Sequence, residues 1–114
     1  MGLDYPTSSI SSAGDADKML DAANAVQDYY DSVSDEGVFP DDQEAELNRA
    51  KDWIPDAVDV CKSAKSEHRG NADIVDKTDE AMTTLQSVKS DIQSRLTLNE
   101  TQKRLRDERE KGGN

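Results

Sequence analysis

The chain has few of the residues on which disulfide-rich proteins and most enzyme sites depend. Its 114 residues contain one cysteine, one histidine, one tryptophan and one phenylalanine. A single cysteine excludes an internal disulfide and favours a reducing compartment. No apolar run has the length of a membrane span or a signal-peptide centre, and Pro6 stands where a myristoylation signal has Ser or Thr. We therefore expect a cytoplasmic protein without membrane contact, although a non-classical secretion route stays compatible with these features.

Large apolar residues are also scarce. Leu, Ile, Val and Phe number 19 of the 114 residues and the net charge is −11, a combination found in chains that bury too little apolar surface to fold. The apolar residues that are present recur every three or four positions in three stretches, which is the spacing of one helical face. This pattern predicts an all-α protein with one modest core. Helices with so few apolar residues need neighbours, from the same chain or from another.

The start of the chain shows no such pattern. Residues 1–14, "MGLDYPTSSISSAG", are rich in Ser and include a Pro and a Gly, so we expect a flexible tail. A first helix is predicted over residues 15–33, followed by a stop signal at Gly37. Its apolar face consists of Ala16, Met19, Leu20, Ala23, Val26, Tyr30 and Val33.

The stretch "SDEGVFPDDQEAE", residues 34–46, carries six carboxylates in thirteen positions. A calcium loop with Gly37 at its sixth position would place serines at positions one and three and Gln43 at position twelve, which excludes an EF-hand. Asp41 and Glu44 instead have the spacing of a capping box, in which each side chain bonds a free backbone N–H at the start of a helix. The sequence therefore predicts a second helix that begins near Asp41.

The second helix has the most regular pattern. A seam with the 3-4 spacing of a coiled coil consists of Leu47, Ala50, Ile54, Ala57, Cys61, Ala64 and His68. A lone Trp can be an interface anchor, but the place of Trp53 beside this seam favours a core position for its ring. Pro55 removes one backbone hydrogen bond, and because the seam keeps its phase across Pro55 we expect a kink and not a break.

Gly70 and Asn71 predict the end of the second helix and the cap of a third. Residues 99–114 contain one large apolar residue, Leu105, so we expect them to project beyond the core as a charged helix end. The predicted divisions are a tail (1–14), a helical bundle (15–98) and this projecting end (99–114). The third helix presents Ile74, Val75, Ala81, Met82, Leu85, Val88, Ile92 and Leu96 on one face.

Short connections between amphipathic helices make them neighbours, so the predicted architecture is an antiparallel three-helix bundle. Its seam is rich in Ala and therefore buries little apolar surface per turn. Such a bundle gains stability by pairing with a second copy or with another protein.

Charge is distributed unevenly along the chain. Residues 1–60 hold 15 acidic and 3 basic residues, whereas residues 61–114 hold 10 acidic and 11 basic ones. In the first two helices the aspartates fall opposite the apolar faces, where they would meet solvent or a partner. The candidate partner-binding residues are these aspartates and one neighbouring aromatic residue: Asp17, Asp21, Asp28, Tyr29, Asp31 and Asp35 at the first helix, and Asp52, Asp56 and Asp59 on the second.

Two interpretations of these acidic stripes stay open. One stripe offers a charge about every 7 Å, so two adjacent stripes would be needed to approach the charge spacing of a DNA strand, about 3.4 Å. The stripes therefore fit either a surface that docks on a basic protein or a solvated face that aids solubility. Direct binding of nucleic acid is not expected, because the basic cluster at residues 103–111 is interleaved with three acids.

The sequence offers little support for catalysis. Cys61 and His68 are one seam repeat apart, but a nucleophile and base at these positions would lie in the core without a third group. Further ligands at matched spacing for a metal are missing. We expect no enzymatic activity, no cofactor and no metal, and a buried structural position for Cys61.

Two classes of function remain. The first is a small regulator or inhibitor that docks its acidic face on the basic surface of a nucleic-acid-handling protein, the general character of phage-encoded antagonists by analogy only. The second is a structural or secreted helical subunit, or an assembly chaperone, that neighbouring copies complete.

Because the seam buries little apolar surface, the stability of the chain can be predicted to depend on association. Because association stabilises a marginal helical core by mass action, we expect the melting temperature to rise with protein concentration or with added partner. Circular dichroism melting over a hundredfold concentration range measures this. A strongly stable monomer with one melting temperature throughout would contradict it.

Overall fold

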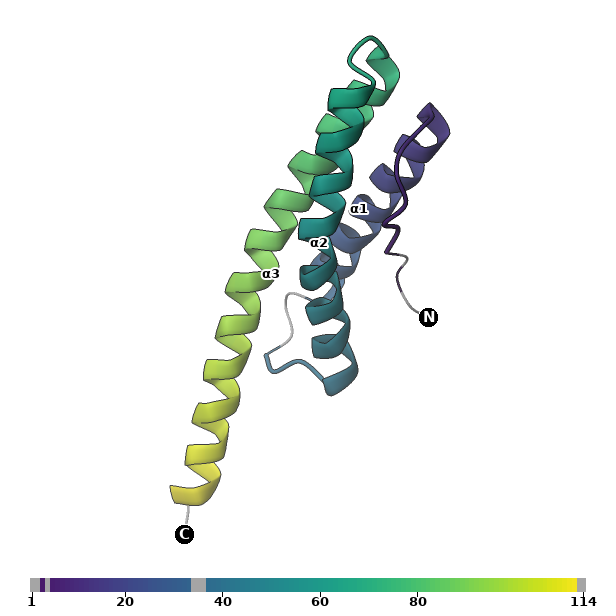
Figure 1. The fold of residues 1–114 in the computed structure, drawn as a ribbon. Helices are drawn as coiled ribbons and strands as arrows, with labels where there is room; N and C mark the ends of the chain where they lie inside the picture. Colours follow the sequence, from purple (N-terminus) through teal and green to yellow (C-terminus); the bar gives the residue numbers. More distant parts are fainter. Residues whose placement is uncertain (1–2, 4, 34–36, 113–114) are drawn as a thin grey trace.

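The computed structural model describes residues 3, 5–33 and 37–112 of the chain. They form three helices: α1 (Ala13–Val33), α2 (Asp41–Glu67) and α3 (Ala72–Gly112). The described residues contain no strand, so the all-α prediction is confirmed. Consecutive helices run in opposite directions, and the molecule is a rod of 67 × 24 × 19 Å whose lower end in Figure 1 is α3 alone.

The other two helices pack on α3. Both α1 and α2 contact it extensively, whereas α1 and α2 make few contacts with each other. The side of α3 that faces them is buried at every third or fourth residue: Ile74, Thr78, Ala81, Leu85, Val88, Ile92, Arg95 and Asn99. The apolar pattern of the sequence fades before the end of this seam, because the last two buried residues, Arg95 and Asn99, are polar.

The predicted apolar faces of α1 and α2 lie in the core. In α1, Leu20 and Tyr30 are half-buried and the other five predicted residues are buried. In α2 the seam is buried from Leu47 to Ala64. Trp53 is 5% exposed, which confirms its predicted core position.

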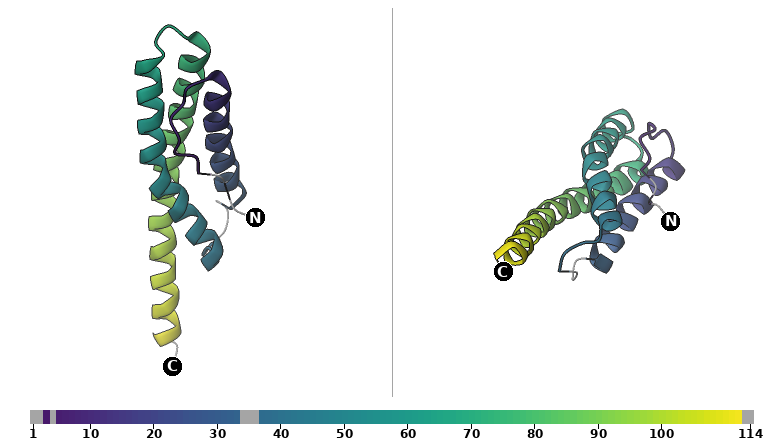
Figure 2. Two further views of the ribbon diagram at one scale, coloured as in Figure 1. Left: turned by 45° about the vertical axis from the view of Figure 1, so that its right-hand side comes forward. Right: turned by 90° about the horizontal axis from the view of Figure 1, so that it is seen from below.

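Both α2 and α3 have the boundaries that local sequence signals favour. α2 continues through Pro55 without interruption, and Figure 2 shows the helix changing direction along its length, as a proline inside a helix requires. At the start of α3, the Ile74 N–H donates to Asn71 Oδ1 over 3.2 Å, which confirms the predicted cap.

α2 begins at Asp41 as predicted, but its N-terminal cap differs from the prediction. Its N-cap is Pro40, which makes no side-chain capping hydrogen bond. With Pro40 at the cap, Asp41 lies in the first turn and Glu44 lies one position too far along for a capping box. The Glu44 carboxylate accepts hydrogen bonds from Asn99 and Lys103 of α3 instead. The capping-box prediction is therefore wrong.

The residues before α1 also differ from the flexible tail that composition predicts. Residues 5–12, called the N-terminal strap below, lie between α1 and α2 (Figure 2). Ile10 is 3% exposed, and the Tyr5 ring centre lies 5.5 Å from that of Trp53. Trp53 Nε1 donates to the Pro6 carbonyl over 2.8 Å. Because α1 and α2 scarcely touch, the groove between them is wet unless another segment fills it, and the strap does so.

Hydrogen bonds between the end of the strap and Asp15 cap the start of α1. Ser12 Oγ accepts from the Asp15 N–H over 3.2 Å, while the Ser11 N–H and Oγ donate to the Asp15 carboxylate over 3.1 and 3.0 Å. The hydrogen bonds from Ser11 hold the Asp15 pKa below its usual value. This reciprocal pattern fixes the angle at which the strap leaves the helix.

The end of the packed part of α3 can be tested by truncation. A chain ending at Lys103 keeps Asn99, which is fully buried and bonds the Phe39 N–H over 2.8 Å, and we expect it to melt like the full chain. A chain ending at Leu98 lacks Asn99, and we expect its free energy of unfolding to fall by about 1–3 kcal/mol, because the buried Phe39 N–H loses its acceptor. Urea denaturation of the two truncated chains measures the difference. Equal stability would show that this contact contributes nothing.

Candidate protein-binding surfaces

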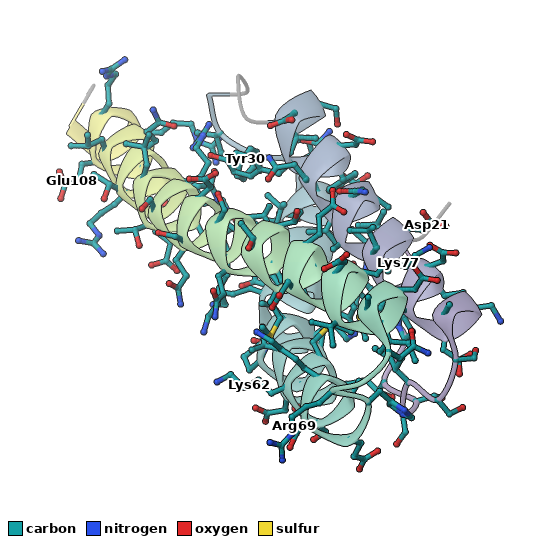
Figure 3. All side chains as sticks on the ribbon, turned by 90° about the horizontal axis from the view of Figure 1, so that it is seen from above. Asp21, Tyr30, Lys62, Arg69, Lys77 and Glu108 are labelled. Atoms are coloured by element: carbon teal, nitrogen blue, oxygen red, sulfur yellow. The ribbon has the colours of Figure 1, made fainter. Side chains whose placement is uncertain are left out.

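The aspartates of α1 differ in what they contact. Asp21 and Asp28 are exposed and bond no residue that the structure describes. Asp17 is exposed but accepts a hydrogen bond from Lys77 of α3, which raises the Lys77 pKa. Figure 3 shows Asp21 close to Lys77 at the boundary of α1 and α3. Asp17 is therefore partly used by the fold, whereas Asp21 and Asp28 remain available to a partner.

The other predicted residues of this helix occupy three situations. Asp31 is exposed and accepts from Gln27 Nε2 over 3.0 Å. Tyr29 is half-buried against the core, and burial raises the pKa of its hydroxyl. Asp35 lies outside the described residues.

The aspartates of α2 form a second stripe. Asp52, Asp56 and Asp59 are exposed, as expected for positions opposite the buried seam. The N-terminal strap separates this stripe from that of α1: Asp21 lines a hollow with Tyr5 and Pro6, and Asp59 lines another with Ser9 and Ile10. The two stripes therefore border the strap from opposite sides and do not merge into one surface.

A partly buried polar cluster lies where the α1–α2 connection crosses α3. Asn99 accepts from the Phe39 N–H and donates to Glu44 Oε2 over 2.6 Å, and Lys103 Nζ donates to the same oxygen over 2.5 Å. Arg95 Cζ lies 4.4 Å from the centre of the Phe39 ring. The sequence reading missed this cluster, although Arg95 and Asn99 continue the 3-4 spacing of the α3 seam. Because these groups bond one another, we interpret the cluster as part of the fold and not as a binding site.

A basic hollow lies at the far end of α2. It is a shallow, open depression lined by Lys62, Lys65, Arg69 and Met82, with Ser66. Figure 3 shows Lys62 and Arg69 on the opposite side of the molecule from Asp21. Lys65 forms an ion pair of 2.6 Å with Asp79, and cations near a helix C-terminus offset the helix dipole.

The two residues weighed for catalysis are not arranged as a nucleophile and base. Cys61 is fully buried, as predicted, and burial raises the pKa of its thiol to about 11. His68 is the C-cap of α2, where its backbone N–H donates to the Ala64 carbonyl over 2.9 Å. Within the described ranges, no three metal-ligating side chains are grouped to hold an ion. None of the described helices is long and apolar enough to cross a membrane.

Comparisons with known proteins add no family to this description. No protein-family model, curated protein or solved structure matches the chain. Any functional conclusion therefore rests on the surfaces themselves.

The Glu44 cluster predicts a pH dependence. The hydrogen bond from Lys103 holds the Glu44 pKa below its usual value, against the opposing effect of burial. A carboxylate whose pKa is lowered by folding stabilises the folded state above its unfolded pKa, and the contribution is lost as pH falls through the folded value. We expect the melting temperature to fall below about pH 4.3, and to fall less in Glu44→Gln. Asp52→Asn, which changes an unpaired exposed carboxylate, is the control with the wild-type slope. An unchanged slope in Glu44→Gln would contradict the assignment.

Proposed function

We propose that the protein is a non-catalytic binding module that docks the acidic outer face of α1 on a basic surface of another protein. The observation that supports this most is the division of the carboxylates. Several have partners inside the fold: Asp15, Asp17, Glu44, Glu46 and Asp79. Others are exposed and bond none of the described residues: Asp21, Asp28, Asp52, Asp56 and Asp59. The carboxylates of this second group repel one another, which destabilises the compact state. Asp21 is the exception in part, because its charge also helps to raise the Lys77 pKa.

The α1 face also carries an aromatic group suited to a basic partner. Tyr29 is adjacent to Asp28 and packs its ring partly against the core. A half-exposed tyrosine beside a carboxylate offers both a π-face and a charge to an arginine. Basic side chains of a partner would therefore meet a face that is matched in charge and contains an apolar edge.

A nucleic-acid-handling protein is the partner class that we favour. Such proteins carry grooves of Lys and Arg that attract phosphates, and an acidic helix competes for the same cations. With the strap between the two stripes, α1 presents one line of charge, which suits a helix lying in a basic groove. The module would then act stoichiometrically, as a regulator or inhibitor, in the cytoplasm.

A structural subunit or assembly chaperone is the second candidate, and one feature of α3 favours it. Leu98 and Leu105 are 47% and 54% exposed and lie seven residues apart, on one face of the projecting helix. Two large apolar residues at this spacing suit contact with another helix.

Paired substitutions on the two stripes test the acidic-face proposal. We expect a chain with Asp21→Asn and Asp28→Asn to keep its helical content, since Asn and Asp have similar helix propensity. The measurement is copurification with mass spectrometry, with the chain as bait. The wild type should retain a basic protein. Added salt should release this protein, because exposed charges are screened beyond about 8 Å at physiological ionic strength. The substituted chain should retain much less of it.

The matched control carries Asp52→Asn and Asp56→Asn, which remove the same charge from α2. The control should retain the partner as the wild type does. Equal retention by the α1 variant, insensitive to salt, would refute docking through α1. Recovery of only further copies of the chain would support the structural-subunit candidate instead.

A further inference from the structure

The groove between α1 and α2 has walls of small residues with one large anchor. On the α1 side, Ala22 and Ala25 line the hollow beside Tyr5, and on the α2 side Val60 and Ala64 line the hollow beside Ile10. Trp53 of α2 is buried, with its ring against that of Tyr5 in the strap. Small side chains leave room for an extended chain, and a buried Trp is a frequent centre of binding energy in protein interfaces.

The N-terminal strap makes the contacts that a bound peptide makes. The Tyr5 hydroxyl donates to the Glu46 carboxylate, and the Tyr5 ring packs on Trp53. Trp53 in turn bonds the Pro6 backbone carbonyl, and five residues after Tyr5 the Ile10 side chain is buried. Between these anchors, residues 7–9 are exposed. The groove therefore recognises an aromatic hydroxyl, a backbone carbonyl and a branched aliphatic group at fixed spacing.

Release of the strap would leave the helices in place. The first α1 turn keeps its cap, because Ser12 Oγ and the Asp15 N–H both lie at the helix end of the strap. Both α1 and α2 keep their packing on α3, which holds them without help from each other. Only the strap contacts themselves would be lost.

We infer that this groove is a binding site for an extended peptide segment of a partner protein, and that the N-terminal strap is the occupant that such a segment displaces. The segment carries an aromatic residue and, five positions later, a branched aliphatic residue. Asp59 and Glu67 line the hollow beside Ile10, so basic residues just before the aliphatic anchor fit. In the hollow beside Tyr5, by contrast, Lys18 offsets Asp21. This basic character rests on the function proposed above, whereas the groove itself does not.

Trp53 is the single tryptophan and reports on the groove directly. In the full chain carrying Tyr5→Ala and Ile10→Ala, we expect its fluorescence emission to shift to longer wavelength, because the weakened strap exposes the ring to water. A synthetic peptide of residues 3–12 should reverse the shift saturably. The wild-type chain should bind the same peptide at least about tenfold more weakly, since its own strap leaves few grooves open.

The control peptide carries Tyr5→Ala and Ile10→Ala and should have no effect. A variant chain with wild-type emission and no response to the unsubstituted peptide would overturn the inference. If the variant loses its helical circular dichroism, hydrogen exchange at the Trp53 indole N–H of the wild-type chain decides. Exchange much faster than that of buried α3 amides supports strap release, and exchange only by global unfolding overturns it.

A third peptide separates this inference from the acidic-face proposal. In it Ser8→Lys and Ser9→Lys place two cations between the anchors. Tighter binding than the unsubstituted peptide, lost with added salt, supports both proposals. Equal binding of the two peptides leaves the groove in place and counts against a basic partner. Binding of neither overturns the groove.

Discussion

The packing of α1 and α2 on a shared helix is the interaction on which the other features depend. With few large apolar residues, the chain cannot give each pair of helices its own interface. The α3 seam instead serves both neighbours. The open side between α1 and α2 is the geometric consequence, and the strap across it follows from the need to cover Trp53 and the adjoining alanines.

The polar residues at the end of the α3 seam hold the connection between α1 and α2 against α3. Arg95 Nη2 donates to the Gly37 carbonyl over 3.1 Å, while Asn99 holds the backbone of Phe39. Both contacts lie in the connection between α1 and α2, so they fix where that connection crosses α3. Side chains with directional hydrogen bonds specify such a crossing more narrowly than apolar ones would. Two polar seam residues thereby hold the connection between the two helices that carry the aspartate stripes.

Helical periodicity predicted most of the fold because it is a local signal. The first helix was expected over residues 15–33 and spans Ala13–Val33, and the core position of Trp53 follows from its place beside the α2 seam. The strap could not be found this way, since an extended segment buries Ile10 and partly buries Tyr5 without a helical period. Its junction with α1 did carry a signal, the Ser-x-x-Asp spacing of Ser12 and Asp15, which marks a helix start.

The surfaces were predictable in part for the same reason. The exposure of Asp52 and Asp56 follows from their angle to the buried seam. The pairing of Asp17 with Lys77 depends on the relative register of α1 and α3, which no local pattern contains. The same holds for Glu44, whose partners stand 55 and 59 residues away.

The length of α3 has a practical consequence for work with this protein. Beyond Asn99 the helix runs on to Gly112, about 20 Å at the usual rise, with little apolar contact. A reporter domain fused after this arm would stand clear of the stripes and the groove. The same domain fused ahead of residue 3 would pull on the strap and alter how often Trp53 is covered. The site of attachment would therefore change the binding behaviour being measured.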